Sequence, residues 1–197
     1  MRGSEPILAD TACVRTVTLS DQRLLLRPFT PEDIPAIYEA CQDPEIQRWT
    51  SIPSPYRHSD AEMFVKEIVP IGWATGTEAG FGVFERVSGR LVGSLGLMHI
   101  SPEGSRDGRM AEVGFWTAKE MRGRGYTTDA VRLACRWAFD ELQVARIEWY
   151  AEIGNEPSRR VAEKVGFVFE GTLRSRLVHG GERRDAWLAS LLPADLS

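Results

Sequence analysis

One short segment has the composition of a loop that binds phosphate: Arg122, Gly123, Arg124, Gly125, Tyr126, Thr127 and Thr128. A strand-like run precedes it, and apolar residues recur at helical spacing from Asp129 to Leu142. The first turn of a helix offers backbone N–H groups without an internal partner, together with partial positive charge. Glycines beside that turn let a large anion approach the main chain. These features predict a phosphate or pyrophosphate site.

Two other Gly-rich motifs fit the segment less well. A P-loop requires Gly-Lys followed by Ser or Thr, and the chain contains no Gly-Lys pair. A dinucleotide fingerprint requires a third glycine where Thr128 stands. A turn between a strand and a helix that binds no ligand is a further interpretation of the segment taken alone.

The composition favours one folded domain with a small anionic ligand. The chain has 197 residues, 43% of them hydrophobic, which is enough for a substantial core. The formal net charge of −4 argues against nucleic acid or a membrane as a partner. The arginines cluster at 122–124, 159–160 and 183–184, an arrangement that suits a small anion better than a polyanion.

The cysteines and the ends of the chain indicate location and domain limits. Cys13, Cys41 and Cys135 are odd in number and far apart, which predicts a reduced, cytoplasmic protein without a metal site. We found neither a signal-like segment nor a run of 18 apolar residues. Residues 1–20 are expected to be a loose arm or an extra edge strand, 21–192 a single domain, and 193–197 a tail.

Strand and helix patterns alternate around the Gly-rich loop. Strands are expected near 23–29, 80–86, 91–100, 110–117, 145–152, 167–176 and 185–191, and helices near 30–41, 60–73, 129–142 and 155–165. Met63, Phe64, Ile68 and Ile71 are expected to face inward. Short turns make the early strands antiparallel, whereas a helical crossover makes 110–117 and 145–152 parallel. The expected fold is of the α/β class, with a mixed, mostly antiparallel sheet and about four helices.

Four motifs follow one another in a fixed order: 111–116 (AEVGFW), 122–126 (RGRGY), 155–158 (NEPS) and 163–171 (EKVGFVFEG). The second fits the pattern Arg/Gln-x-x-Gly-x-Gly/Ala, although Thr127 replaces the usual small last residue. In this order the motifs resemble the GNAT acetyltransferase superfamily, and within it the ribosomal-protein N-terminal acetyltransferases of the RimJ/RimL type. The resemblance spans roughly residues 20–192 and implies a GNAT fold whose central parallel strands splay apart at the acyl-CoA site.

The resemblance also implies a reaction. An acyl group, acetyl above all, would pass from acetyl-CoA to an amine by direct attack, with no acyl-enzyme and no metal. The amine would be a protein N-terminus or a small molecule, received near 49–57 and 98–108. The segment 49–57 is expected to be a loop, either bordering that site or simply connecting elements at the surface. The implied CoA-binding positions are the seven loop residues together with Phe115, Trp116, Thr117, Asn155 and Ser158.

Two residues are candidates for proton transfer. Glu112 is the candidate base for the amine, directly or through water, and its alternative is a salt-bridged or edge-exposed carboxylate. Ser158 is the candidate proton donor to the leaving thiolate. Its alternative is a place in the first helical turn, with Asn155 as the helix cap. A catalytically silent CoA-binding or sensing module would keep the Gly-rich loop but need neither group, and an NAD- or ATP-binding protein is a weaker option. A homodimer is one of the states that the sequence leaves open.

Overall fold

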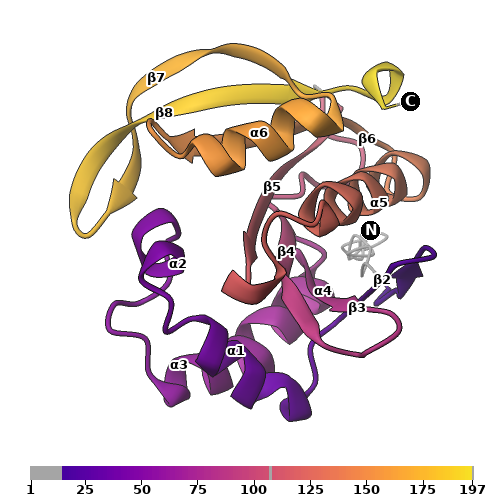
Figure 1. The fold of residues 1–197 in the computed structure, drawn as a ribbon. Helices are drawn as coiled ribbons and strands as arrows, with labels where there is room; N and C mark the ends of the chain where they lie inside the picture. Colours follow the sequence, from indigo (N-terminus) through magenta and orange to yellow (C-terminus); the bar gives the residue numbers. More distant parts are fainter. Residues whose placement is uncertain (1–14, 107, 197) are drawn as a thin grey trace, which may run out of the picture.

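An eight-stranded sheet runs through the described part of the protein, which comprises residues 15–106 and 108–196 of a computed structural model (Figure 1). The strands are β1 (Leu19–Ser20), β2 (Leu24–Arg27), β3 (Ala79–Glu85), β4 (Leu91–Met98), β5 (Arg109–Thr117), β6 (Val144–Glu152), β7 (Val168–His179) and β8 (Glu182–Leu191). Their order is β1-β2-β3-β4-β5-β6-β8-β7. Only β5 and β6 run parallel. The expected mixed, mostly antiparallel sheet is therefore confirmed.

Helices cover the sheet in two groups (Figure 1). They are α1 (Ile34–Ala40), α2 (Pro44–Trp49), α3 (His58–Met63), α4 (Val69–Thr75), α5 (Tyr126–Asp140) and α6 (Glu156–Val165). Short 3-10 turns lie at Pro31–Asp33, Lys119–Met121 and Pro193–Asp195. Helices α1 to α4 lie in the lower half of Figure 1, whereas α5 and α6 lie in the upper half, with α6 under the β7–β8 hairpin. No helix among the described residues is long and apolar enough to cross a membrane.

The two parallel strands pair over only part of their length. Their register runs from Arg109 opposite Val144 to Val113 opposite Trp149. Beyond that point β5 continues along β4 as far as Thr117, and β6 continues along β8 as far as Glu152. The two strands therefore diverge, and from 114 to 117 the edge of β5 that faces β6 has no strand paired to it. This is the splayed pair that the resemblance implies.

Helix α5 joins the two parallel strands and packs against the sheet. Val131, Ala134, Cys135 and Ala138, four of the residues that recur at helical spacing, are fully buried. The helix begins at Tyr126 rather than Asp129, so the last three residues of the expected loop form its first turn. The backbone amides of the motif are consequently the amides of a helix N-terminus.

The helix expected near 60–73 is present but presents a different face. Met63, Ile68 and Ile71 are exposed, by 44%, 44% and 59%, so their expected inward position is wrong. The buried hydrophobic residues are Ala61, Val65, Val69 and Trp73, which recur every four positions. A π turn at Phe64–Ile68, closed by the Val69 N–H on the Phe64 carbonyl, allows this wider period.

Helix α2 and the edge strand β1 complete the comparison with expectation. The sequence interpretation contained no helix at Pro44–Trp49, yet Asp43 caps one there, accepting a hydrogen bond from the Glu45 N–H at 3.2 Å. Trp49 therefore ends a helix instead of opening a loop. Leu19–Ser20 forms a short edge strand, whereas residues 1–14 lie outside the described part.

Candidate active site

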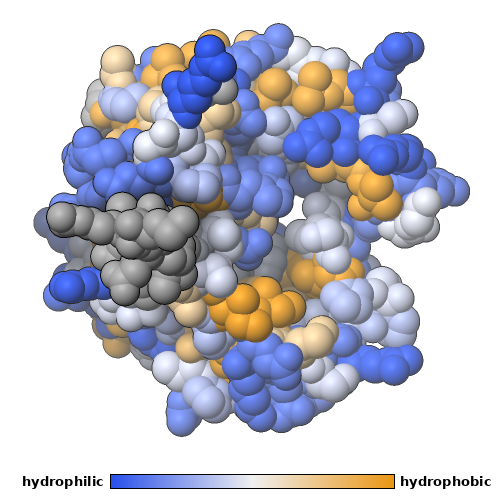
Figure 2. Space-filling view, turned by 180° about the vertical axis from the view of Figure 1, so that it is seen from behind, coloured by the Kyte–Doolittle hydropathy of each residue, from blue (hydrophilic) through white to orange (hydrophobic). Residues whose placement is uncertain are grey.

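Two cavities adjoin where β5 leaves β6. The loop cavity, of about 360 Å³, is bordered by the Gly-rich loop, the first turn of α5 and one face of α6. The hairpin cavity, of about 330 Å³, is bordered by β4, the ends of β6 and β7, and the segment after α2. Six residues line both cavities: Trp49, Thr50, Phe115, Trp116, Asn155 and Ser158. From behind, the surface is hollowed between its upper and lower halves (Figure 2).

The main chain of the Gly-rich loop fits an anion. Gly123 and Gly125 have φ values of 75° and 80°, in the left-handed region that favours glycine. A Cβ on Gly123 would meet no atom within 4 Å, and one on Gly125 would meet only the Arg23 guanidinium at 3.9 Å. The space beside both glycines is therefore open.

The first turn of α5 supplies hydrogen-bond donors to that space. Its first helical bond runs from the Asp129 N–H to the Gly125 carbonyl, over 3.1 Å. The N–H groups of residues 126–128 have no main-chain acceptor among the described residues. Three amides and the positive end of a 15-residue helix thus converge beside the loop cavity.

Side chains of the loop mostly brace it. Arg122 donates to the Thr117 carbonyl at 3.1 Å and forms an ion pair with Asp43, the cap of α2. The Thr127 hydroxyl lies 2.6 Å from that of Thr117, which ties the start of α5 to β5.

Every predicted CoA-binding residue lines the loop cavity except Arg124. The Arg124 carbonyl instead accepts a hydrogen bond from Arg23 at 2.8 Å. The rest of the motif surrounds one cavity.

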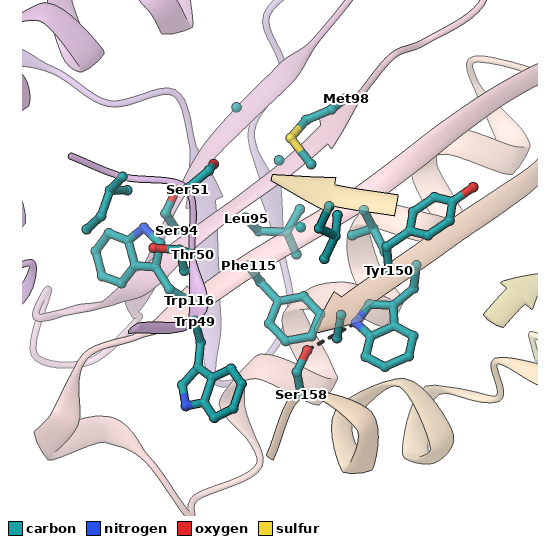
Figure 3. Close-up of a pocket in the computed structure, with 18 of the residues that line it drawn as sticks. Trp49, Thr50, Ser51, Ser94, Leu95, Met98, Phe115, Trp116, Tyr150 and Ser158 are labelled. Carbon is teal, nitrogen blue, oxygen red and sulfur yellow. Dashed lines mark hydrogen bonds between the residues drawn. The ribbon is translucent and has the colours of Figure 1, made fainter. Parts of the chain in front are cut away.

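Ser158 stands at the junction of the cavities with its proton available. The indole Nε1 of Trp149, which can only donate, lies 3.1 Å from the Ser158 oxygen (Figure 3). Ser158 is thus the acceptor in that bond and keeps its own O–H for another partner. Asn155 accepts from the Ser158 N–H at 3.2 Å, so the helix-cap role considered for Asn155 is observed.

Glu112 is not brought to that junction. It lies on β5 two residues before Gly114, and neither it nor its partner His99 lines either cavity. Its carboxylate is 3.2 Å from the Nδ1 of His99, which is 73% exposed. Ser158 therefore lies among the predicted CoA-binding positions, whereas Glu112 lies outside both cavities.

Three polar residues beside the hairpin cavity were not predicted from the sequence as site residues. Arg48 of α2 binds Glu152 of β6 through two bonds, of 2.9 and 3.1 Å. His179 at the end of β7 places Nδ1 3.2 Å from the same carboxylate. The hydrogen bond from Arg48 lowers the pKa of Glu152, opposed in part by desolvation. The carboxylate therefore stays ionised and joins three distant parts of the chain.

Arg160 and Lys164 of α6 also line the loop cavity. They share a helix face with Pro157 and Val161, at spacings of three and four residues. Helical spacing counted from Pro157 places Arg160 and Lys164, three and seven residues further on, on this cationic face. Of the segments expected to receive the amine, residues 49–52 and Met98 line the hairpin cavity, whereas residues 53–57, 99–106 and 108 do not. The described residues contain no group of three or more metal-binding side chains.

A splayed parallel pair, a helix N-terminus with unpaired amides and a second cavity at the same strand end form the arrangement that the sequence resemblance predicts for acyl transfer from a CoA thioester. Residues 23–168 match the acetyltransferase (GNAT) domain, and the chain belongs to this family of N-acetyltransferases. Acetyl-CoA is the co-substrate of that family.

Individual relatives agree with this assignment. The chain is 36% identical over 140 residues to the "Putative ribosomal N-acetyltransferase YdaF" of Bacillus subtilis (strain 168), a match covering 68% of this chain and 72% of that protein. A solved structure described as a "putative ribosomal-protein-serine acetyltransferase" from Vibrio cholerae has a TM-score of 0.79 at 25% identity, covering 90% and 98% of the two chains. RimJ of Mycobacterium smegmatis, solved with CoA-disulfide, has a TM-score of 0.79 at 23% identity over 92% and 88%, which supports the fold alone. The similarity to the RimJ/RimL type is thus confirmed.

Proposed function

We propose that the protein transfers the acetyl group of acetyl-CoA to a primary amine by direct attack, without an acyl-enzyme. The observation that carries the proposal is the meeting of two cavities at Phe115, Trp116 and Ser158. One cavity has the donors for a pyrophosphate, and the other offers separate access to the same point. A carrier and an acceptor can therefore approach each other from two directions.

The chain's own groups would act in three ways. The amides of 126–128 and the side chains of Arg160 and Lys164 would hold the phosphates. Backbone N–H groups on the open edge of β5 would polarise the thioester carbonyl and stabilise its oxyanion. Ser158 would protonate the departing thiolate, since its oxygen already accepts from Trp149.

The cysteines support direct attack. Cys41 and Cys135 are buried, and burial raises the pKa of both thiols, that of Cys41 to about 12. A buried, protonated thiol is a poor nucleophile. Cys13 lies outside the described residues.

The amine acceptor would be a peptide N-terminus or a small amine. The name of the Bacillus subtilis relative supports a ribosomal protein as one substrate to test. Glu112 is proposed to assist deprotonation only through water, because it lies outside both cavities. A catalytically silent CoA-binding module would need no base at the site, and the position of Glu112 outside both cavities also fits such a module. This second function therefore needs a direct test.

The test is thiol release from acetyl-CoA with a panel of N-terminal peptides and small amines. Wild type should release thiol and form the acetylated amine. Ser158→Ala should lower kcat on the order of 10²-fold, with a much smaller effect on the Kd for acetyl-CoA. Glu112→Gln should lower kcat less. Binding of acetyl-CoA without turnover of any acceptor would favour the silent module, and full activity of Ser158→Ala would remove its proposed role.

A further inference from the structure

We propose that His179 is the general base for the amine, oriented by Glu152 and Arg48. The inference rests on the proposed acetyl transfer and names a catalytic residue for it. His179 and Glu152 both line the hairpin cavity, which reaches the junction at Ser158. The end of β7 extends into the centre of this cavity, opposite Leu95 and Phe115 (Figure 3).

The carboxylate of Glu152 selects the tautomer of the imidazole. His179 Nδ1 lies 3.2 Å from Glu152 Oε2 and 3.4 Å from Arg48 Nη1. Arg48 Nη1 already donates to Glu152 Oε2 at 3.1 Å, and the contact to the carboxylate is the shorter one. We assign the proton of the neutral ring to Nδ1, which then donates to the carboxylate, and we treat the longer contact to Arg48 as no hydrogen bond. A carboxylate that holds Nδ1–H leaves Nε2 with an unshared electron pair.

The second ring nitrogen is available for catalysis. Within residues 15–106 and 108–196, Nε2 of His179 has no hydrogen-bond partner. The side chain is 27% exposed, so water and a substrate can reach it. An acceptor-only nitrogen beside the cavity is what removal of a proton from an ammonium group requires.

Charged groups from three elements face His179. Arg48 comes from α2 and Glu152 from β6. Glu182 of β8 is the strand partner of His179, and its carboxylate binds Arg184 at 2.5 Å. Glu152 is thus the only one of these carboxylates in contact with the ring among the described residues, which makes it the positioning residue.

The proton balance of the step is complete. An acceptor R–NH₃⁺ gives one proton to Nε2 of His179, and its nitrogen then attacks the thioester carbon. The C–N bond forms and the C–S bond breaks as the tetrahedral intermediate collapses. Ser158 protonates the thiolate, and the remaining excess proton on nitrogen returns to Ser158 through water. His179 releases its proton to solvent, so one proton leaves per turnover.

The experiment compares the pH profiles of kcat/KM for three variants with the most active acceptor. His179→Gln should lower kcat on the order of 10²-fold near neutral pH. Its activity should then rise with pH towards the pKa of the acceptor amine itself, with the Kd for acetyl-CoA unchanged. Glu152→Gln should show a smaller loss, because the ring remains but its orientation is no longer fixed. His58→Gln is the matched control, since His58 lies on α3 outside both cavities.

A second measurement separates catalysis from folding. Imidazole added to His179→Gly should restore part of the turnover, whereas it should not restore Ser158→Ala. Full activity or an unchanged pH profile in His179→Gln would overturn the inference and leave the acetyl transfer standing. An equal loss of acetyl-CoA affinity would also overturn it, because His179 would then be structural. An inactive wild type would remove the proposed function and this inference together.

Discussion

The loop cavity and the hairpin cavity share one junction but are built differently. The loop cavity takes most of its polar groups from the main chain of a single stretch, Phe115 to Thr128, and adds cations from α6. The hairpin cavity is assembled from side chains of α2, β4, β6 and β7, which are far apart in the sequence. Diphosphate is the same in every turnover, so fixed amides suit it. The acceptor side depends on individual side chains, which can change without altering the fold.

The largest expected effect comes from the backbone of the Gly-rich loop. Gly125→Val forces a β-branched residue to φ 80° and adds atoms to the open space of the loop cavity. The Kd for acetyl-CoA, measured by calorimetry, should rise at least about 10²-fold, because close approach to the amides is lost.

Gly89→Val supplies the control for that change. Gly89 has φ 68° and open space around it, but it lies in the turn between β3 and β4, outside both cavities. The Gly89→Val variant should have backbone strain similar to that of Gly125→Val and should bind acetyl-CoA with the Kd of wild type. Equal losses of affinity in the two variants would show that strain alone, and not the loop cavity, explains the effect.

A smaller effect is expected in the hairpin cavity. Arg48→Gln removes the paired bond that joins α2 to Glu152 and weakens the hold on His179. Because Arg48 is 47% exposed, KM for the acceptor should rise only roughly two- to fivefold. The Kd for acetyl-CoA should not change, which would separate the two cavities functionally.

A double-mutant cycle sharpens this prediction. Arg48→Gln and Glu152→Gln should be non-additive in kcat/KM, since each removes the same contact. Additive effects would mean that the two residues act independently and that Arg48 has no part in orienting the cluster.

The same contrast explains what the sequence could predict. The splayed pair, α5, α6 and the loop residues follow from motifs in which neighbouring residues carry the information. Around the loop cavity, the sequence analysis missed only local details, such as the start of α5 at Tyr126. Arg124 was included although its side chain does not line the loop cavity, because a motif does not say which way each residue points.

The hairpin side could not be predicted in the same way. The Arg48–Glu152–His179 cluster joins residues more than 100 positions apart, and no local pattern marks such a contact. Helix α2 could have been predicted, because Asp43-Pro44 supplies an N-cap residue followed by proline at the first helical position. Thr30-Pro31 starts a helical turn in the same way. The buried face of α3 and α4 could not have been predicted from ordinary helical spacing, because the π turn between them changes the spacing of the buried residues.

The smallest predicted effect concerns the opposite end of β7, away from His179. Glu170 binds Arg146 through two bonds, of 2.8 and 2.7 Å, and accepts from Ser190 at 2.5 Å. The bond from Arg146, followed by that from Ser190, lowers the pKa of Glu170 to about 2. This end of β7 is therefore fixed by an ion pair whose two residues line neither cavity.

Glu170→Gln should lower the free energy of unfolding by at most about 1 kcal/mol at pH 7, because the carboxylate is 36% exposed. Because the pKa of Glu170 is lowered by folding, its ion pair contributes fully to the free energy of unfolding above pH 4.5, the ordinary pKa of a glutamate. That contribution is lost as the pH falls towards about 2. Urea unfolding of both proteins between pH 7 and pH 3 should therefore show a difference that shrinks below about pH 5. Acetyl-CoA binding and the pH profile of kcat/KM should stay as in wild type. If Glu170→Gln instead altered that profile, the two ends of β7 would be coupled, and the hairpin could not be treated as a separate acceptor-side element.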